Sequence, residues 1–222
     1  MGLDMYLNRM PRFRAYTAKK VSDIENYFSW LERGERHANC SLEEWCGLKR
    51  VPAQAAIDFY RPYWVKRYSD WDTEKKYGHN EIMEQVGYWR KANHIHKWFV
   101  DNIQDGEDDC RYHREVRKTD LEELLRVCNE VIASTKLVSG KVYNGTRWNR
   151  QTGETIEYID GLILEDTVAA EELLPTEGGF FFGSTGYDEW YMRDIEHTIE
   201  VIENVLETTD FNTQMIYYVS SW

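Results

Sequence analysis

The sequence predicts an α+β fold: a small, mostly antiparallel sheet built from both termini, with several amphipathic helices packed on it. Two observations support this. Residues 3–7 alternate in polarity as a short strand does, and residues 215–222 have the apolar, aromatic pattern of a second strand. Between these ends, several segments repeat their apolar residues every three or four positions, as helices with one buried face do. The 222 residues fit a single domain, 1–222.

Charge and composition narrow the class of function. The net charge of −12 weighs against direct nucleic-acid binding, which depends on neutralising phosphates, but it allows a local pocket for a small anion. No apolar run approaches a membrane span, and the N-terminus lacks a signal pattern. The four cysteines form no C-x-x-C pair. We therefore expect a cytoplasmic protein with free thiols, no membrane partner and no cofactor.

Two helices are predicted early in the chain. The first spans about residues 23–33 and ends at Gly34, and the second begins at a capping box formed by Ser41 and Glu44. Three side chains that can bind a metal lie near the second helix: His37, Cys40 and Cys46. A zinc site needs a fourth ligand and a tighter cysteine spacing than these residues offer. No metal site is predicted.

Residues 52–72 are rich in aromatic and basic side chains. Such interleaving can stack nucleic-acid bases, but the acidic charge of the chain opposes a long nucleic-acid track. We therefore expect residues 52–72 to lie in the core or at a subunit interface. A subunit interface would make the protein a homo-oligomer. A polar linker at 72–80 follows.

A central helix is predicted over residues 82–103. A 3.6-residue period places Ile82, Val86, Trp89, Ala92, Val100 and Ile103 on one stripe. Asn93 and His96 fall on the same stripe, with Arg90 at its edge. An unpaired buried amide or imidazole costs roughly 1–3 kcal/mol, so these polar groups either have partners in the core or line a pocket. Asp109 and Asp188 are the candidate partners.

Three further elements follow. An acidic stretch at 101–110 lacks calcium-loop spacing and is expected to be a solvated loop. Thr119 and Glu122 form a capping box that opens a helix with an apolar inner face: Leu121, Leu124, Leu125, Cys128, Val131 and Ile132. Residues 141–158 are a β-hairpin excursion from the domain, with a turn at 151–153. A short helix at 166–174 ends before Pro175.

The stretch 178–185 predicts a buried strand at Phe180–Phe182, followed by a turn into a long helix. Ser184 or Thr185 is expected to cap that helix, and Asp188 begins its inner stripe: Tyr191, Ile195, Thr198, Ile199, Ile202 and Val205. A strand that turns into a helix presents free N–H groups to an anion. The predicted ligand-binding residues are accordingly Trp89, Arg90, Asn93, His96, Ser184, Thr185, Asp188 and Tyr191.

Several motifs resemble an uncharacterised family of proteins encoded by bacteriophages and prophages. They are MGLDMYL at 1–7, YWRKAN at 88–93, IHKWFV at 95–100, GFFFGST at 179–185, YDEWY at 187–191 and the IYY and SSW runs near the end. The resemblance covers about half of the chain. It implies a phage accessory protein in the host bacterial cytoplasm and supplies no catalytic residue.

Three functions are compatible with these observations. The first is a counter-defence binding protein. It would either sequester a small anionic ligand, namely a nucleotide-type signal, or block a bacterial immune protein. The second is a hydrolase or phosphodiesterase that uses the region of His96 and Asp188. The third is a structural or regulatory phage protein. His94 and His96 point about 200° apart on a helix, so they cannot share one metal ion there.

Overall fold

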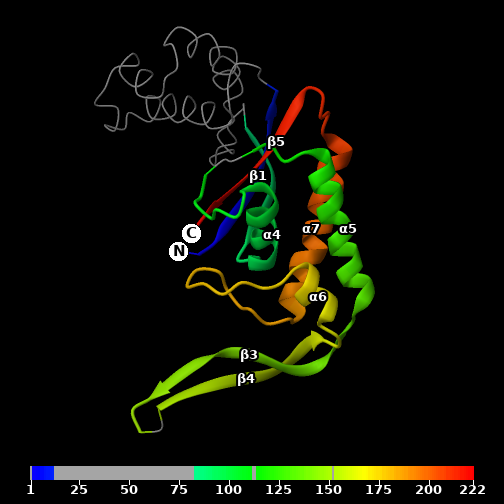
Figure 1. Ribbon diagram of the computed structural model, residues 1–222. Coiled ribbons are helices and arrows are strands. Elements are labelled where there is room, and N and C mark those ends of the chain that lie inside the picture. The colour runs from blue at the N-terminus through cyan, green and yellow to red at the C-terminus, as the bar shows by residue number, and fades with distance from the viewer. Residues whose placement is uncertain (1, 13–82, 112–113, 152) are drawn as a thin grey trace, which may run out of the picture.

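A computed structural model describes residues 2–12, 83–111, 114–151 and 153–222. This part of the chain contains five strands and four helices and confirms the α+β fold (Figure 1). The predicted helices near 23–33 and 41–47, and the aromatic stretch 52–72, lie outside the described residues.

Both ends of the chain lie in one antiparallel sheet, as predicted. Strand β1 (Asp4–Pro11) is central, with β2 (Glu84–Arg90) on one side and β5 (Gln214–Ser221) on the other. Leu7 pairs with Gly87 of β2 and with Tyr218 of β5.

The prediction that Phe180–Phe182 forms a buried strand is wrong. These residues form a turn, and Phe180 is 97% exposed.

The predicted central helix divides into a strand and a helix. Residues 84–90 form β2, and only Asn93–Ile103 form helix α4. Gly87 and Trp89 are buried while Tyr88 and Arg90 are exposed, which is the two-residue period of a strand. Trp89 fits both the helical and the strand period, so the apolar stripe could not distinguish a helix from a strand. Pairing with β1 determines that these residues form a strand. Lys91, with φ of 61°, turns the chain between the two elements.

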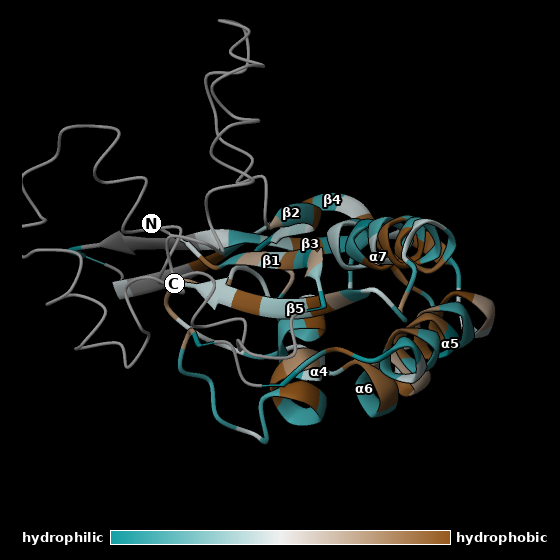
Figure 2. Ribbon diagram, turned by 90° about the horizontal axis from the view of Figure 1, so that it is seen from above, coloured by the Kyte–Doolittle hydropathy of each residue, from teal (hydrophilic) through white to brown (hydrophobic). Residues whose placement is uncertain are grey.

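Two helices cover the buried face of the sheet. Phe99 of α4 stacks on Tyr218 of β5 with a ring-centroid distance of 4.1 Å and also contacts the ring of Trp89. The Trp89 indole donates a hydrogen bond of 2.9 Å to Thr198 in α7 (Glu189–Thr208), which fixes α7 against β2. Figure 2 shows α4 on one side of the sheet, with the other helices beside it.

Helix α5 (Lys118–Ser134) packs along α7 through the predicted inner face, with Leu125 and Ile132 at its margin. Its start differs from the prediction. The N-cap is Arg117, two residues before the predicted N-cap Thr119, and the helix begins at Lys118. Asp120 takes the capping-box role expected of Glu122, because its carboxylate accepts a hydrogen bond from the N-cap N–H of Arg117. Burial raises the pKa of Asp120, but hydrogen bonds from Arg117 and Arg114 outweigh it and bring the pKa to about 2.

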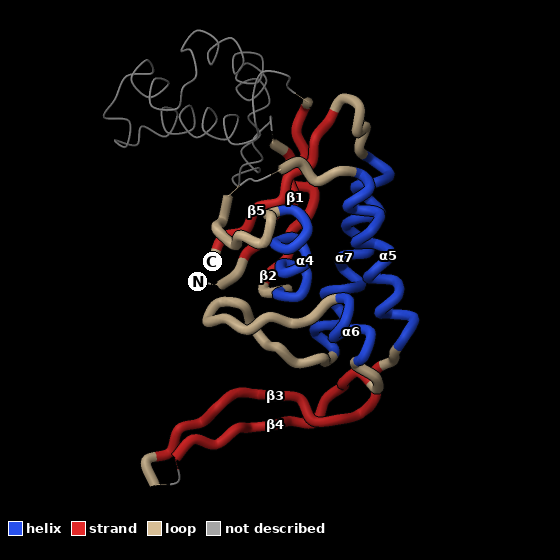
Figure 3. The backbone as a smooth tube through the Cα atoms, in the orientation of Figure 1, coloured by secondary structure: helices blue, strands red, loops and turns tan. Residues whose placement is uncertain are grey.

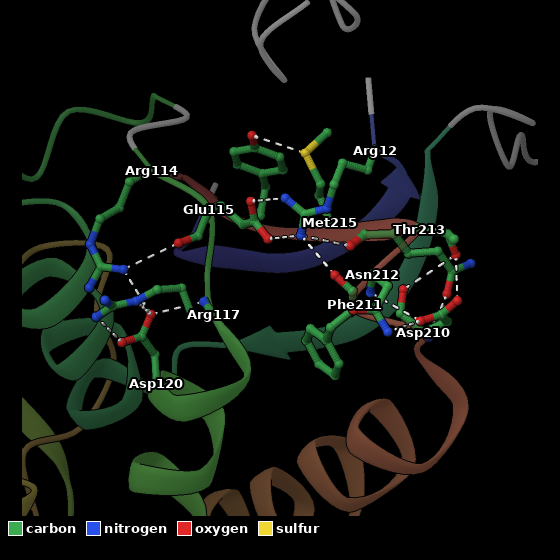
Figure 4. A network of polar contacts seen from close by, with 12 residues as sticks. Arg12, Arg114, Glu115, Arg117, Asp120, Asp210, Phe211, Asn212, Thr213 and Met215 are labelled. Atoms are coloured by element: carbon green, nitrogen blue, oxygen red, sulfur yellow. Dashed lines mark hydrogen bonds and ion pairs between the residues drawn. The ribbon is translucent and has the colours of Figure 1, made fainter. Parts of the chain in front are cut away.

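Figure 4 shows how charged groups join this end of α5 to the sheet. The Arg12 guanidinium pairs with Glu115 at 2.5 Å and donates to the carbonyls of Phe211 and Gln214. Val116 forms a backbone bridge to Ile216 of β5. The chain entering α5 is thereby tied to both terminal strands.

The hairpin is longer than predicted. Strand β3 (Leu137–Asn149) pairs with β4 (Gly153–Leu164) in a two-stranded sheet that projects from the rest of the molecule (Figure 3). Its base is held by the backbone bond from Leu164 N–H to the Tyr187 carbonyl. Helix α6 (Val168–Leu173) follows, within the predicted range 166–174.

Gly87 provides a test of the packing between β2 and α7. A Cβ added at this glycine would lie 2.7 Å from Val201 Cγ1 and 3.1 Å from Leu7 Cβ, and valine cannot rotate freely away. We expect Gly87→Ala to lower the free energy of unfolding by about 1–3 kcal/mol. Gly178→Ala is the control, because its Cβ would meet only Thr185 Cγ2, at 3.9 Å. Equal denaturant midpoints for the two variants would contradict this packing.

Candidate functional site

One cavity, of about 300 Å³, lies between the turn joining β2 to α4, the loop 176–186 and the first turns of α7. Figure 1 shows these three segments next to one another. The residues lining the cavity include five of the eight predicted ligand-binding residues: Arg90, Asn93, Ser184, Asp188 and Tyr191. The other lining residues are Lys91, His94, Thr176, Gly183, Gly186, Trp190 and Asp194.

Asn93 holds the loop against helix α4. Its Nδ2 donates to the carbonyls of Phe182 (3.1 Å) and Ser184 (2.8 Å), and its Oδ1 accepts from the Glu177 N–H at 2.9 Å. The side chain is almost fully buried. Asn93 is therefore both a satisfied core group and part of the cavity wall.

Asp188 is the N-cap of α7, and the prediction of Ser184 or Thr185 in this role is wrong. The Asp188 Oδ1 accepts hydrogen bonds from the N–H groups of Trp190 (2.9 Å) and Tyr191 (3.3 Å). Ser184 instead stabilises the loop, because its Oγ accepts from the Gly186 N–H. The correction follows from N-cap geometry: the capping carboxylate stands directly before the first helical residue, Glu189.

Two basic side chains form another wall of the cavity. The Arg90 guanidinium lies 3.1 Å from the Asp4 carboxylate and its side chain is 55% exposed. The ammonium of Lys91 has no carboxylate partner within the described ranges. The Lys91 N–H donates to the Leu3 carbonyl, and Leu3 in turn donates to the Phe181 carbonyl, so the backbone ties the turn to the loop.

His94 lines the cavity, although it was not among the predicted ligand-binding residues. It is 2% exposed, and its Nε2 has no hydrogen-bond partner among the described residues. Its ring lies 4.2 Å from that of Tyr191. Burial lowers the pKa of His94 to about 3, so the imidazole is neutral at physiological pH.

Asp194 is the second missed residue. Its carboxyl group makes no hydrogen bond or ion pair with the described part of the chain. Burial, with a smaller contribution from the nearby charge of Asp188, raises its pKa to about 7. A signal for it existed in the sequence: Asp194 stands three residues after Tyr191 and four before Thr198, which places an acid on the inner stripe of α7.

Three predicted site residues do not line the cavity. Trp89 is in the core beside α7, and the Thr185 carbonyl accepts a hydrogen bond from Thr176. His96 is fully buried between other partners: Nδ1 lies 2.6 Å from the Tyr218 hydroxyl, and Nε2 lies 3.2 Å from Asp108 Oδ2. The prediction that Asp188 reaches His96 or Asn93 is therefore wrong. The acidic loop does supply a partner for His96, but it is Asp108, the residue before Asp109.

The described residues contain no group of three or more histidine, cysteine, aspartate or glutamate side chains placed to hold a metal ion. The helices in the same part of the chain are too short or too polar to span a bilayer. Comparisons of this chain with protein families, with curated proteins and with solved structures find no match.

Proposed function

We propose that this protein binds a small anionic ligand of nucleotide type in the cavity beside α7. The observation that carries the proposal is that two polar groups without partners in the described chain, His94 Nε2 and the Asp194 carboxyl, line one cavity together with the cations Arg90 and Lys91. A buried imidazole nitrogen without a partner lowers stability by about 1–3 kcal/mol. A ligand that pairs with it would recover part of that free energy.

The composition of the wall suits such a ligand. Basic side chains attract a phosphate or carboxylate, and Trp190 and Tyr191 offer aromatic surface for a ring. A volume of about 300 Å³ is at the lower end of the range for ligand pockets and matches a single nucleotide better than a larger molecule. In the context implied by the phage-family resemblance, the protein would sequester a signal of bacterial immunity in the host cytoplasm.

A hydrolase is the second candidate, and Asp194 is the observation that favours it. A carboxyl group with a pKa of about 7 is matched to proton transfer near neutral pH, and the carboxylate of Asp188 lines the same cavity. Asp194 replaces His96 in this alternative, because His96 lies outside the cavity. Incubation with nucleotides and separation of the products distinguishes turnover from binding.

Lys91 provides the test of anion binding. Titration calorimetry with a panel of 5′-nucleotides is expected to find at least one ligand, and Lys91→Gln should weaken its affinity about tenfold, which corresponds to roughly 1.4 kcal/mol for one charge-assisted hydrogen bond. Lys97→Gln is the matched control, because the Lys97 ammonium pairs with Asp101 and Lys97 does not line the cavity. Failure of every nucleotide to bind, or equal effects of the two substitutions, would count against the proposal.

A further inference from the structure

Resting on the proposed function, we infer that the cavity selects guanine among the nucleobases, with Asp194 as the residue that recognises the base. The inference depends on how Trp190, Asp194, His94 and Lys91 are distributed around the cavity. All four line it, and they come from the start of α7, from α4 and from the turn before α4.

Trp190 provides the surface on which a base can stack. Its side chain is 59% exposed and lines the cavity. The Arg193 guanidinium, which does not line the cavity, lies 4.9 Å from the centroid of the indole ring. One face of the indole therefore has a cation over it, and a base in the cavity would stack on the opposite face. Stacking alone accepts every base, so selectivity has to come from a polar group at the edge of the ring.

Asp194 is placed to supply that polar group. It lies four residues after Trp190, one turn along the same face of α7. An ionised carboxylate accepts hydrogen bonds and donates none. Guanine is the nucleobase whose Watson–Crick edge offers two adjacent donors, N1–H and the N2 amino group. Adenine offers an acceptor at N1, which an ionised carboxylate repels. Guanine is therefore the base that satisfies both oxygens of Asp194.

The other unpaired groups complement the rest of a guanine nucleotide. A neutral imidazole can carry its proton on Nε2, so His94 can donate to the O6 carbonyl next to N1–H. The Lys91 ammonium, unpaired within the described chain, remains for the phosphate. Each of these three side chains thereby receives a partner of matching chemistry.

The groups around Asp194 determine how guanine binding depends on pH. Asp188 lies near it at the start of α7, and neutral His94 of α4 and the cations Arg90 and Lys91 of the turn before α4 line the same cavity. The loop contributes the uncharged side chains of Thr176 and Ser184. Free Asp194 has a pKa of about 7 and has to lose its proton to accept both N–H groups. Guanine binding should therefore weaken as the pH falls below 7.

The test measures the affinities of the 3′,5′-cyclic monophosphates of guanosine, inosine and adenosine by titration calorimetry. Their phosphodiester keeps one fixed charge between pH 6 and pH 8, so phosphate titration does not interfere. We expect cyclic GMP to bind most tightly, cyclic IMP about tenfold more weakly because it lacks the N2 amino group, and cyclic AMP weakest. The affinity for cyclic GMP should fall about tenfold from pH 8 to pH 6, following the ionised fraction of Asp194.

Asp194→Asn should remove the preference for cyclic GMP over cyclic AMP and the pH dependence together. Glu196→Gln is the matched control, since it removes the same charge from an exposed position on the same helix. Melting curves of both variants establish that they fold. Equal affinities for cyclic GMP and cyclic AMP, or an unchanged preference in Asp194→Asn, would overturn the assignment of guanine and leave the nucleotide site standing. If neither the cyclic nor the 5′-nucleotides bind, the proposed function fails as well.

Discussion

Removal of residues 214–222 is expected to unfold the protein. Strand β5 pairs with β1 over eight residue pairs and buries four consecutive side chains, Met215, Ile216, Tyr217 and Tyr218. At about 1.5–3 kcal/mol for each buried side chain, their loss is comparable to the whole stability of roughly 5–15 kcal/mol that a domain has. The truncation also removes the partner of Phe99 and the hydroxyl group next to His96. Far-UV circular dichroism and thermal melting measure the result.

Removal of Trp222 alone is the control for this truncation. Its indole donates one hydrogen bond to Asp108, but the side chain is partly exposed and lies beyond the strand. We expect a decrease in stability of about 1 kcal/mol. If the long truncation melts cooperatively near the full-length temperature, β5 does not support the sheet as described.

Asn93→Ala is expected to lower the free energy of unfolding by about 3 kcal/mol, because it removes three hydrogen bonds at a buried position. The carbonyls of Phe182 and Ser184 and the N–H of Glu177 would then lack their partner in α4. The loop that forms one wall of the cavity would no longer be fixed to the helix. Ligand affinity should fall with the stability, and denaturant unfolding with calorimetry at matched pH measures both.

Arg90→Ala separates the effect on folding from the effect on binding. The Arg90 side chain lines the cavity, is largely exposed and makes one ion pair, with Asp4, so the substitution should cost less than about 1 kcal/mol of stability. Because the variant lacks a guanidinium that can bind phosphate, its ligand affinity should fall without a matching fall in melting temperature. If Asn93→Ala and Arg90→Ala destabilise the protein equally, the role assigned to Asn93 is wrong.

Elements with a long, regular pattern could be predicted from the sequence. Helices α5 and α7, the hairpin and both terminal strands lie where the periodicity placed them, although the hairpin is longer than predicted by four residues at one end and six at the other. Short apolar segments were ambiguous. Trp89 satisfies both the helical and the strand period, and the three phenylalanines at 180–182 have the apolar run of a buried strand without a neighbouring strand to pair with among the described residues.

The candidate site was predictable only in part. Five of the predicted residues line the cavity, since a polar residue within an apolar pattern is visible in the sequence. The partners were not visible. His96 has Tyr218, which is 122 positions away, and Asp108 as partners, whereas His94 has no partner for its Nε2 within the described ranges. Two histidines separated by one residue thus have different surroundings, which no local pattern distinguishes.

The sequence by itself determined the α+β class, the two terminal strands and the amphipathic helices, because these depend on side-chain period, which is a local property. Only the tertiary structure decided that β2 completes the sheet and that Asp194 and His94 share a cavity with Lys91. Those outcomes depend on which backbone and side-chain groups meet across distant parts of the chain. The pKa of Asp194 shows the same dependence: it reaches about 7 because folding buries that carboxyl group and places Asp188 nearby.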